Sequence, residues 1–128
     1  MNHSKATFFA RILMGLIFFV FGLNGFFLFI PIPEPAAEFS AFIGAMIETG
    51  YFMTFVKLTE IICGLFLLFN CYVPVVLLIL APIVINIFLI HLFLDPGGLV
   101  MGILLLALLV FLARSYWRYY QPLFTMKA

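Results

Sequence analysis

Two charged side chains lie near the middle of a long apolar stretch. In the segment GYFMTFVKLTEIICGLFLLFN, residues 50–70, the charged residues are Lys57 and Glu60. At a spacing of i and i+3 they share one face of a helix, where they can pair with each other or exchange protons with a bound molecule. A charge at the centre of a bilayer costs about 2.5 to 3.5 kcal/mol on insertion scales. The pair therefore indicates either a functional site or a structural ion pair, and the sequence leaves both open.

Other polar side chains occur inside the remaining apolar runs, at a depth that matches this pair. A helical rise of about 1.5 Å per residue puts Glu60, Asn86 and Asn24 at similar depth. On the same count, Lys57 lies one turn further out and His91 lies near the outer surface. We therefore predict a ligand-binding layer across three helices, formed by Asn24, Lys57, Glu60, Asn86 and His91.

The amino-acid composition indicates that these residues lie on membrane-spanning segments. The 128-residue chain is 67% hydrophobic and 9% charged, and its mean hydropathy is +1.33. Soluble domains are about half apolar and about a quarter charged. We therefore predict an integral membrane protein with the lipid bilayer as its surroundings, folded as a single membrane domain over residues 1–128.

The apolar runs predict an all-α, integral membrane four-helix bundle, because about 20 helical residues cross a bilayer. A short interfacial helix is expected between the first and second spans, with Phe39, Ile43 and Met46 on one face. The first run is too long for a signal peptide's apolar core and ends in PIPEP, so we expect it to be retained. The expected spans cover residues 8–30, 51–69, 74–94 and 97–117, and the interfacial segment covers residues 35–49.

Glycines predict where the helices pack closely. Gly15 and Gly22 give the first span a smooth side, and Gly98 and Gly102 form a GxxxG pattern, which alone is a weak signal in membrane helices. The basic residues lie near the two termini, namely Lys5, Arg11, Arg114, Arg118 and Lys127. Because basic residues favour the cytoplasmic side, we expect both termini in the cytoplasm of a bacterial cell, with the chain in the plasma (inner) membrane. Arg11 is most simply a topology anchor.

Several functions are disfavoured by the sequence. A net charge of +1 provides no basic field for nucleic acid. Cys63 and Cys71 form neither a CxxC nor a metal-binding pattern, so no metal site and no covalent cofactor are expected. The chain also shows no haem, flavin or iron–sulfur signature, so a redox role would require a redox partner protein.

The ordered polar positions resemble those of the DoxX family of small four-helix membrane proteins. The resemblance rests on ARILMGLIFFVFGLNGFF at residues 10–27, KLTEIICGLFLLF at 57–69 and LLILAPIVINIFLIHLFL at 77–94. It implies a four-helix membrane bundle, and some members are small subunits of a thiosulfate:quinone oxidoreductase. It also implies that Glu60, Asn86 and His91 are family-typical positions. No family catalytic cysteine is matched, so thiol-based redox chemistry is not expected.

Two functions remain after these exclusions. The first is an accessory subunit of a membrane redox system that binds a quinone or similar lipophilic ligand in the polar layer. The second is a non-enzymatic assembly or lipid-binding component in which the layer is structural. A transporter is less favoured, since four helices leave little room for alternating access. Whether the protein is an enzyme, and whether it forms a homo-oligomer, the sequence leaves open.

Overall fold

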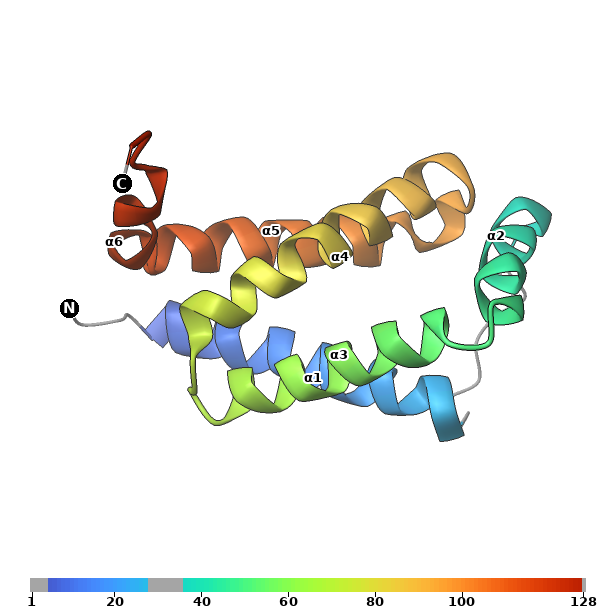
Figure 1. Cartoon of the computed structure of the whole chain (residues 1–128), viewed down its shortest axis with the longest axis horizontal. Coiled ribbons are helices and arrows are strands. Elements are labelled where there is room, and N and C mark those ends of the chain that lie inside the picture. The colour runs from blue at the N-terminus through green and yellow to red at the C-terminus, as the bar shows by residue number, and fades with distance from the viewer. Residues whose placement is uncertain (1–4, 28–35, 128) are drawn as a thin grey trace.

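The computed structural model describes residues 5–27 and 36–127, and within these ranges every regular element is a helix. This confirms the all-α prediction. The chain follows the order shown in Figure 1: α1 (Lys5–Phe27), α2 (Ala37–Glu48), α3 (Phe52–Leu68), α4 (Val73–Phe93), η1 (Pro96–Gly98), α5 (Leu99–Ser115), α6 (Trp117–Tyr120) and η2 (Gln121–Phe124).

The long helices have the length and composition to cross a bilayer. Among the described residues, α1, α4 and the segment Pro96–Ser115 each qualify alone. With 17 residues, α3 is about 26 Å long, slightly less than a hydrocarbon core of about 30 Å. It qualifies only together with α2, from which it is bent by 96°. This arrangement fits an integral membrane protein with three or four spans.

The predicted boundaries agree with the helices to within about three residues where the two can be compared. The second span is shorter than predicted at both ends, because it begins at Phe52 and ends at Leu68. The interfacial segment forms a helix as expected, over Ala37–Glu48. Residues 28–30 of the first predicted span and residue 35 of the interfacial segment lie outside the described residues.

The helices associate mainly as two pairs, α1 with α3 and α4 with α5, and α1 also contacts α5. Glycine allows the first pair to meet backbone to backbone. A Cβ added at Gly64 would lie 2.6 Å from the backbone nitrogen of Phe19, and one at Gly15 would lie 3.1 Å from the carbonyl oxygen of Gly64. The close-packing role predicted for Gly15 and Gly22 is therefore confirmed.

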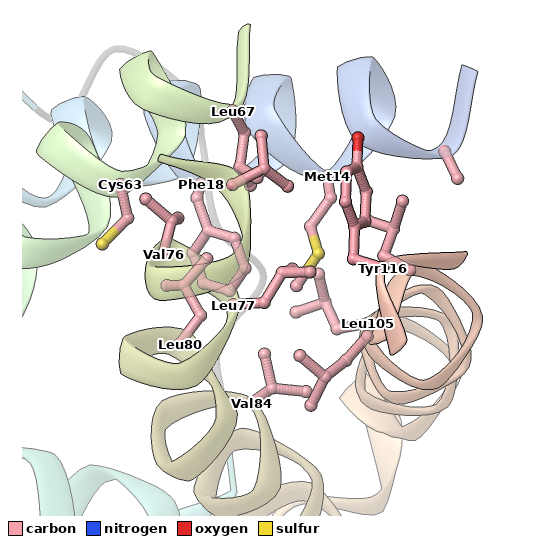
Figure 2. Packing of buried hydrophobic residues seen from close by; sticks show 14 of the residues in the cluster. Met14, Phe18, Cys63, Leu67, Val76, Leu77, Leu80, Val84, Leu105 and Tyr116 are labelled. Atoms are coloured by element: carbon pink, nitrogen blue, oxygen red, sulfur yellow. The ribbon is translucent and has the colours of Figure 1, made fainter. Parts of the chain in front are cut away.

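The buried core lies in only one half of the bundle, at the end that carries Lys5, Ser115 and the turn of residues 69–72. Figure 2 shows core side chains such as Met14, Leu67, Leu77 and Leu105 meeting there. Among described residues, α3 has no buried residue before Glu60 and α4 has none after Val84. The α3 and α4 helices are therefore buried against the bundle at this end, which we call the terminal end, whereas toward α2 the close packing that remains includes that of α1 on α3 at Gly22 and Gly25.

Buried polar contacts tie the helix ends together at the terminal end. Arg11 is 7% exposed and donates hydrogen bonds to the carbonyl oxygens of Leu67 and, at 3.3 Å, of Leu68. Both carbonyls lie at the end of α3, where carbonyl groups lack helical donors. The guanidinium gives the Leu68 carbonyl a donor and adds a second one to the Leu67 carbonyl, which also accepts a 3.3 Å hydrogen bond from the backbone N–H of Asn70. Arg11 is thus a buried helix cap, a role beyond the topology anchor that the sequence suggested.

A second buried hydrogen bond joins the C-terminal segment to the start of α4. The Tyr120 hydroxyl donates a hydrogen bond of 2.7 Å to the carbonyl oxygen of Pro74. Burial, with a smaller contribution from Tyr116, raises the pKa of Tyr120 to about 12. The phenol therefore stays protonated and able to donate across the physiological pH range.

Candidate functional site

A cavity of ≈ 500 Å³ lies between the core and α2, with the core residues Phe18 and Leu105 in its lining. In Figure 1, α3 and α4 spread apart from their connecting turn, and α2 lies at the open end. Most of the lining is apolar, with side chains from all five of the longer helices, including Phe18, Phe39, Ile43, Phe52, Met53 and Met101. The volume and the apolar walls are those of a small-molecule site.

The polar residues that line this cavity are Lys57, Glu60, Asn86 and His91. The structure thus brings together, from α3 and α4, residues that the sequence placed in one layer. The remaining predicted member, Asn24, is 1% exposed within α1 and is not part of the lining. Asn24 interacts with another group of the protein, and its part in ligand binding stays a prediction.

Lys57 and Glu60 form an ion pair on one face of α3. The distance from Lys57 Nζ to Glu60 Oε1 is 3.4 Å, and the two side chains are 24% and 7% exposed. Gly25 of α1 makes room for the lysine stem, since a Cβ there would lie 2.7 Å from Lys57 Cδ. The carboxylate is therefore the deeper member of the pair, and the ammonium lies beside α1.

Asn86 is the most available polar group of the cavity. Asn86 is exposed although it lines the cavity. Within the described part of the chain, its side chain makes no hydrogen bond. Pro82, one turn earlier on α4, is exposed and lines the cavity as well. An amide offers both donors and an acceptor, so Asn86 can bind a carbonyl or a hydroxyl group.

His91 is held in place on several sides. Its Nδ1 lies 3.2 Å from the carbonyl oxygen of Asp95 and 3.8 Å from the Oδ2 atom of that residue. The ring stacks on Phe39 of α2, and a Cβ at Gly98 would collide with His91 Cε1. Gly98, one of the two glycines of the GxxxG pattern, therefore provides the space for the imidazole.

Sequence reasoning found the polar lining but missed most of the apolar lining. The face of α2 with Phe39, Ile43 and Met46 was expected, and these residues do line the cavity. The roles of Met53 and Met101 were missed, since nearly every face of a membrane helix is apolar and hydrophobicity does not single out the packed ones. The sequence also gave no signal for the stacking of Phe39 on His91.

The polar groups that line this cavity can form hydrogen bonds and exchange protons in apolar surroundings. Within residues 5–27 and 36–127, no group of three or more His, Cys, Asp and Glu residues is arranged to hold a metal ion. The available groups suit a lipophilic molecule with a few oxygen atoms. Comparisons of the chain with protein-family models, with curated proteins and with solved structures find no significant match.

Proposed function

We propose that this chain is a DoxX-like membrane protein that binds a quinone or similar lipophilic ligand in the cavity, as an accessory subunit of a membrane redox system. One observation carries the proposal. A cavity of ≈ 500 Å³ with apolar walls gathers a carboxylate, an ammonium, an amide and an imidazole from two helices. The resemblance of residues 10–27, 57–69 and 77–94 to the DoxX family supports the same function.

The groups in the cavity match the chemistry of a quinone. The ring and its lipophilic tail suit the apolar walls, and the Asn86 amide can donate a hydrogen bond to a ring carbonyl. Reduction of a quinone takes up protons as well as electrons. The Lys57 ammonium, which lies 3.4 Å from the Glu60 carboxylate, can donate one of those protons to the reduced ring. The second proton, and the one that recharges the lysine, come from water. The electrons come from a partner redox protein.

The proposal includes a route by which a membrane-dissolved ligand enters. Asn86 and Pro82 are exposed and also line the cavity, so the cavity reaches the outer surface of α4. A ligand can therefore pass from the bilayer between α3 and α4 without crossing water. The basic residues near the termini favour a bacterial plasma membrane with both termini in the cytoplasm, which puts this entrance in the outer half of the bilayer.

The alternative is a non-enzymatic assembly or lipid-binding component with a structural polar layer. One observation favours it, because Lys57 and Glu60 already neutralise each other. However, both residues belong to α3, so their contact joins no two helices. Asn86 makes no hydrogen bond within the described residues that would join α4 to a neighbour. We therefore favour the ligand-binding function.

Binding of a short-chain quinone analogue to the purified protein in detergent tests the proposal. We expect saturable binding that Glu60→Gln and Asn86→Leu each weaken at least about ten-fold, equivalent to about 1.4 kcal/mol. Thr59→Ala is the matched control, since Thr59 precedes Glu60 but bonds the carbonyl oxygen of Phe55 at 2.8 Å and lies outside the lining. If both cavity variants bind as the wild type does and differ only in stability, the structural alternative is correct.

A further inference from the structure

A second hollow lies at the terminal end, away from the cavity. It is a groove of ≈ 290 Å³ between α4, α5 and the C-terminal segment. Its lining is apolar and aromatic and includes Leu78, Ala81, Val110, Ala113, Trp117 and Phe124. The hydroxyl of Tyr120, which also lines it, is already bonded to Pro74. The groove therefore offers an apolar surface and no polar group of its own.

The groove faces outward at the depth of a membrane boundary. Leu78 is 50% exposed, Val110 is 52% exposed and Phe124 is 73% exposed, so these side chains do not belong to the core. The span containing α5 ends at Ser115 and is followed by Tyr116 and Trp117, residues of the aromatic kind that marks a membrane interface. The groove thus runs from the hydrocarbon region to the headgroup region.

Two arginines adjoin residues of the groove in sequence, Arg114 after Ala113 and Arg118 after Trp117, although neither lines the groove itself. Arg114 is exposed and follows Val110 by one helical turn on α5, so it lies on the same face of the helix. Arg118 is also exposed and lies beside Trp117, where its guanidinium donates a 2.8 Å hydrogen bond to the Tyr119 hydroxyl.

Neither guanidinium forms an ion pair with an acidic side chain of the residues that the structure describes. In the described ranges, the ion pairs formed are those of Lys57 with Glu60 and of His91 with Asp95. The acidic residues of those ranges, Glu38, Glu48, Glu60 and Asp95, lie in α2, in α3 or beyond the far end of α4. Arg114 and Arg118 therefore give the terminal end a positive charge that is available to an anion.

We propose that this groove binds an acyl chain of an anionic phospholipid whose phosphate contacts Arg114 and Arg118. The apolar groove suits the acyl chain, and the arginines stand where the phosphate of the same molecule would lie. Charge argues against a second copy of the chain as the occupant. In a two-fold interface the same patch meets itself, so the arginines of both copies would be brought close together. This site is independent of the cavity and of its ligand.

Native mass spectrometry of the detergent-solubilised protein tests the site. The probes are phosphatidylglycerol and phosphatidylcholine with identical acyl chains, added at equal concentrations. We expect phosphatidylglycerol to bind at least ten-fold more tightly. The double variant Arg114→Gln and Arg118→Gln should abolish this preference, whereas Lys5→Gln, which removes a charge at the same end of the molecule, should leave it unchanged. Soluble glycerol phosphate should not displace the lipid.

A groove-filling variant tests the acyl-chain part of the proposal. Ala113→Leu adds volume inside the groove and should lower binding of phosphatidylglycerol at least five-fold. Equal binding of the two lipids by the wild type would overturn the proposal, as would retention of the preference by the double arginine variant. Displacement by glycerol phosphate would show a simple anion site, which also overturns it. If Ala113→Leu converts a dimer to a monomer, the groove is an interface between copies. The arginine variants change exposed residues, so they remain informative even if Ala113→Leu does not fold.

Discussion

The imidazole ring of His91 stacks on the phenyl ring of Phe39, with ring centroids 5.7 Å apart and ring planes inclined by 17°. This contact joins α4 to α2 across the open end of the cavity. It matters because α2 has no buried residue and meets α3 at a bend of 96°. The position of α2 therefore depends strongly on contacts of this kind.

Removing the Phe39 ring should loosen α2 over the cavity. An aromatic pair is worth about 0.5 to 1.5 kcal/mol beyond its buried area, so Phe39→Ala should speed ligand release by about two- to ten-fold. Hydrogen exchange of the α2 amides should rise in parallel. Phe42→Ala is the control, because Phe42 lies on the same helix but outside the cavity lining. Equal effects of the two substitutions would contradict a specific role for the stacking.

Close packing of α1 on α3 should be sensitive to one added methyl group. Gly64→Ala would place a Cβ 2.6 Å from the backbone nitrogen of Phe19, so the helices must separate, at a cost of about 1 to 3 kcal/mol. Gly44→Ala is the matched control in α2, since a Cβ there meets nothing within 4 Å. Unfolding in detergent, followed by circular dichroism, measures both variants. Unchanged stability of Gly64→Ala would show that the helices meet less closely than described.

The cap on α3 should contribute measurably to stability. Arg11→Met keeps most of the side-chain stem but removes the donor to the Leu68 carbonyl and leaves the Leu67 carbonyl with its backbone bond from Asn70 alone. Hydrogen bonds to charged groups contribute about 1.5 to 3 kcal/mol, so the free energy of unfolding should fall by about this amount. Lys5→Gln, an exposed change on the same helix, should have little effect. A loss no larger than that of Lys5→Gln would mean that Arg11 serves only as a topology anchor.

Stability should depend on Tyr120 at high pH. Since the folded protein raises the pKa of this phenol from about 10 to about 12, folding favours its protonated form. The stabilisation is complete below about pH 10, falls as the pH rises and is lost above about pH 12. Tyr120→Phe should unfold with a weaker pH dependence in this window and be about 1 kcal/mol less stable at neutral pH. Tyr72→Phe, at an exposed position, should behave as the wild type does.

The helices and the polar lining could be predicted from the sequence because each rests on a local rule. Apolar runs of sufficient length are helical in a bilayer, and the helical rise sets the depth of Glu60 and Asn86. The prediction that Glu60 and Asn86 share one site rested only on their similar depth in the bilayer. The face of α2 that carries Phe39 followed from the spacing of its apolar residues.

The remaining features depend on the rotation of each helix about its axis, which hydrophobicity does not fix in a membrane protein. Asn24 was expected in the ligand-binding layer, yet it is buried and does not line the cavity. Arg11 lies near the start of its helix, as an anchor should, yet it is turned inward to cap α3. The bend before Phe52 and the stacking on His91 arise from contacts between distant segments, for which the local sequence carries no pattern.

The claim that the cavity binds a quinone is tested most directly by mapping where an azidoquinone attaches to the purified protein. Light-activated labelling followed by peptide mass spectrometry should locate the label on α2, α3 and α4, at residues next to the cavity such as Phe39, Met53 and Asn86. An unmodified short-chain quinone should suppress this labelling. Label that is spread over the exposed surface of α4, including Leu89 and Phe93, and that is not suppressed by the competitor would contradict the claim.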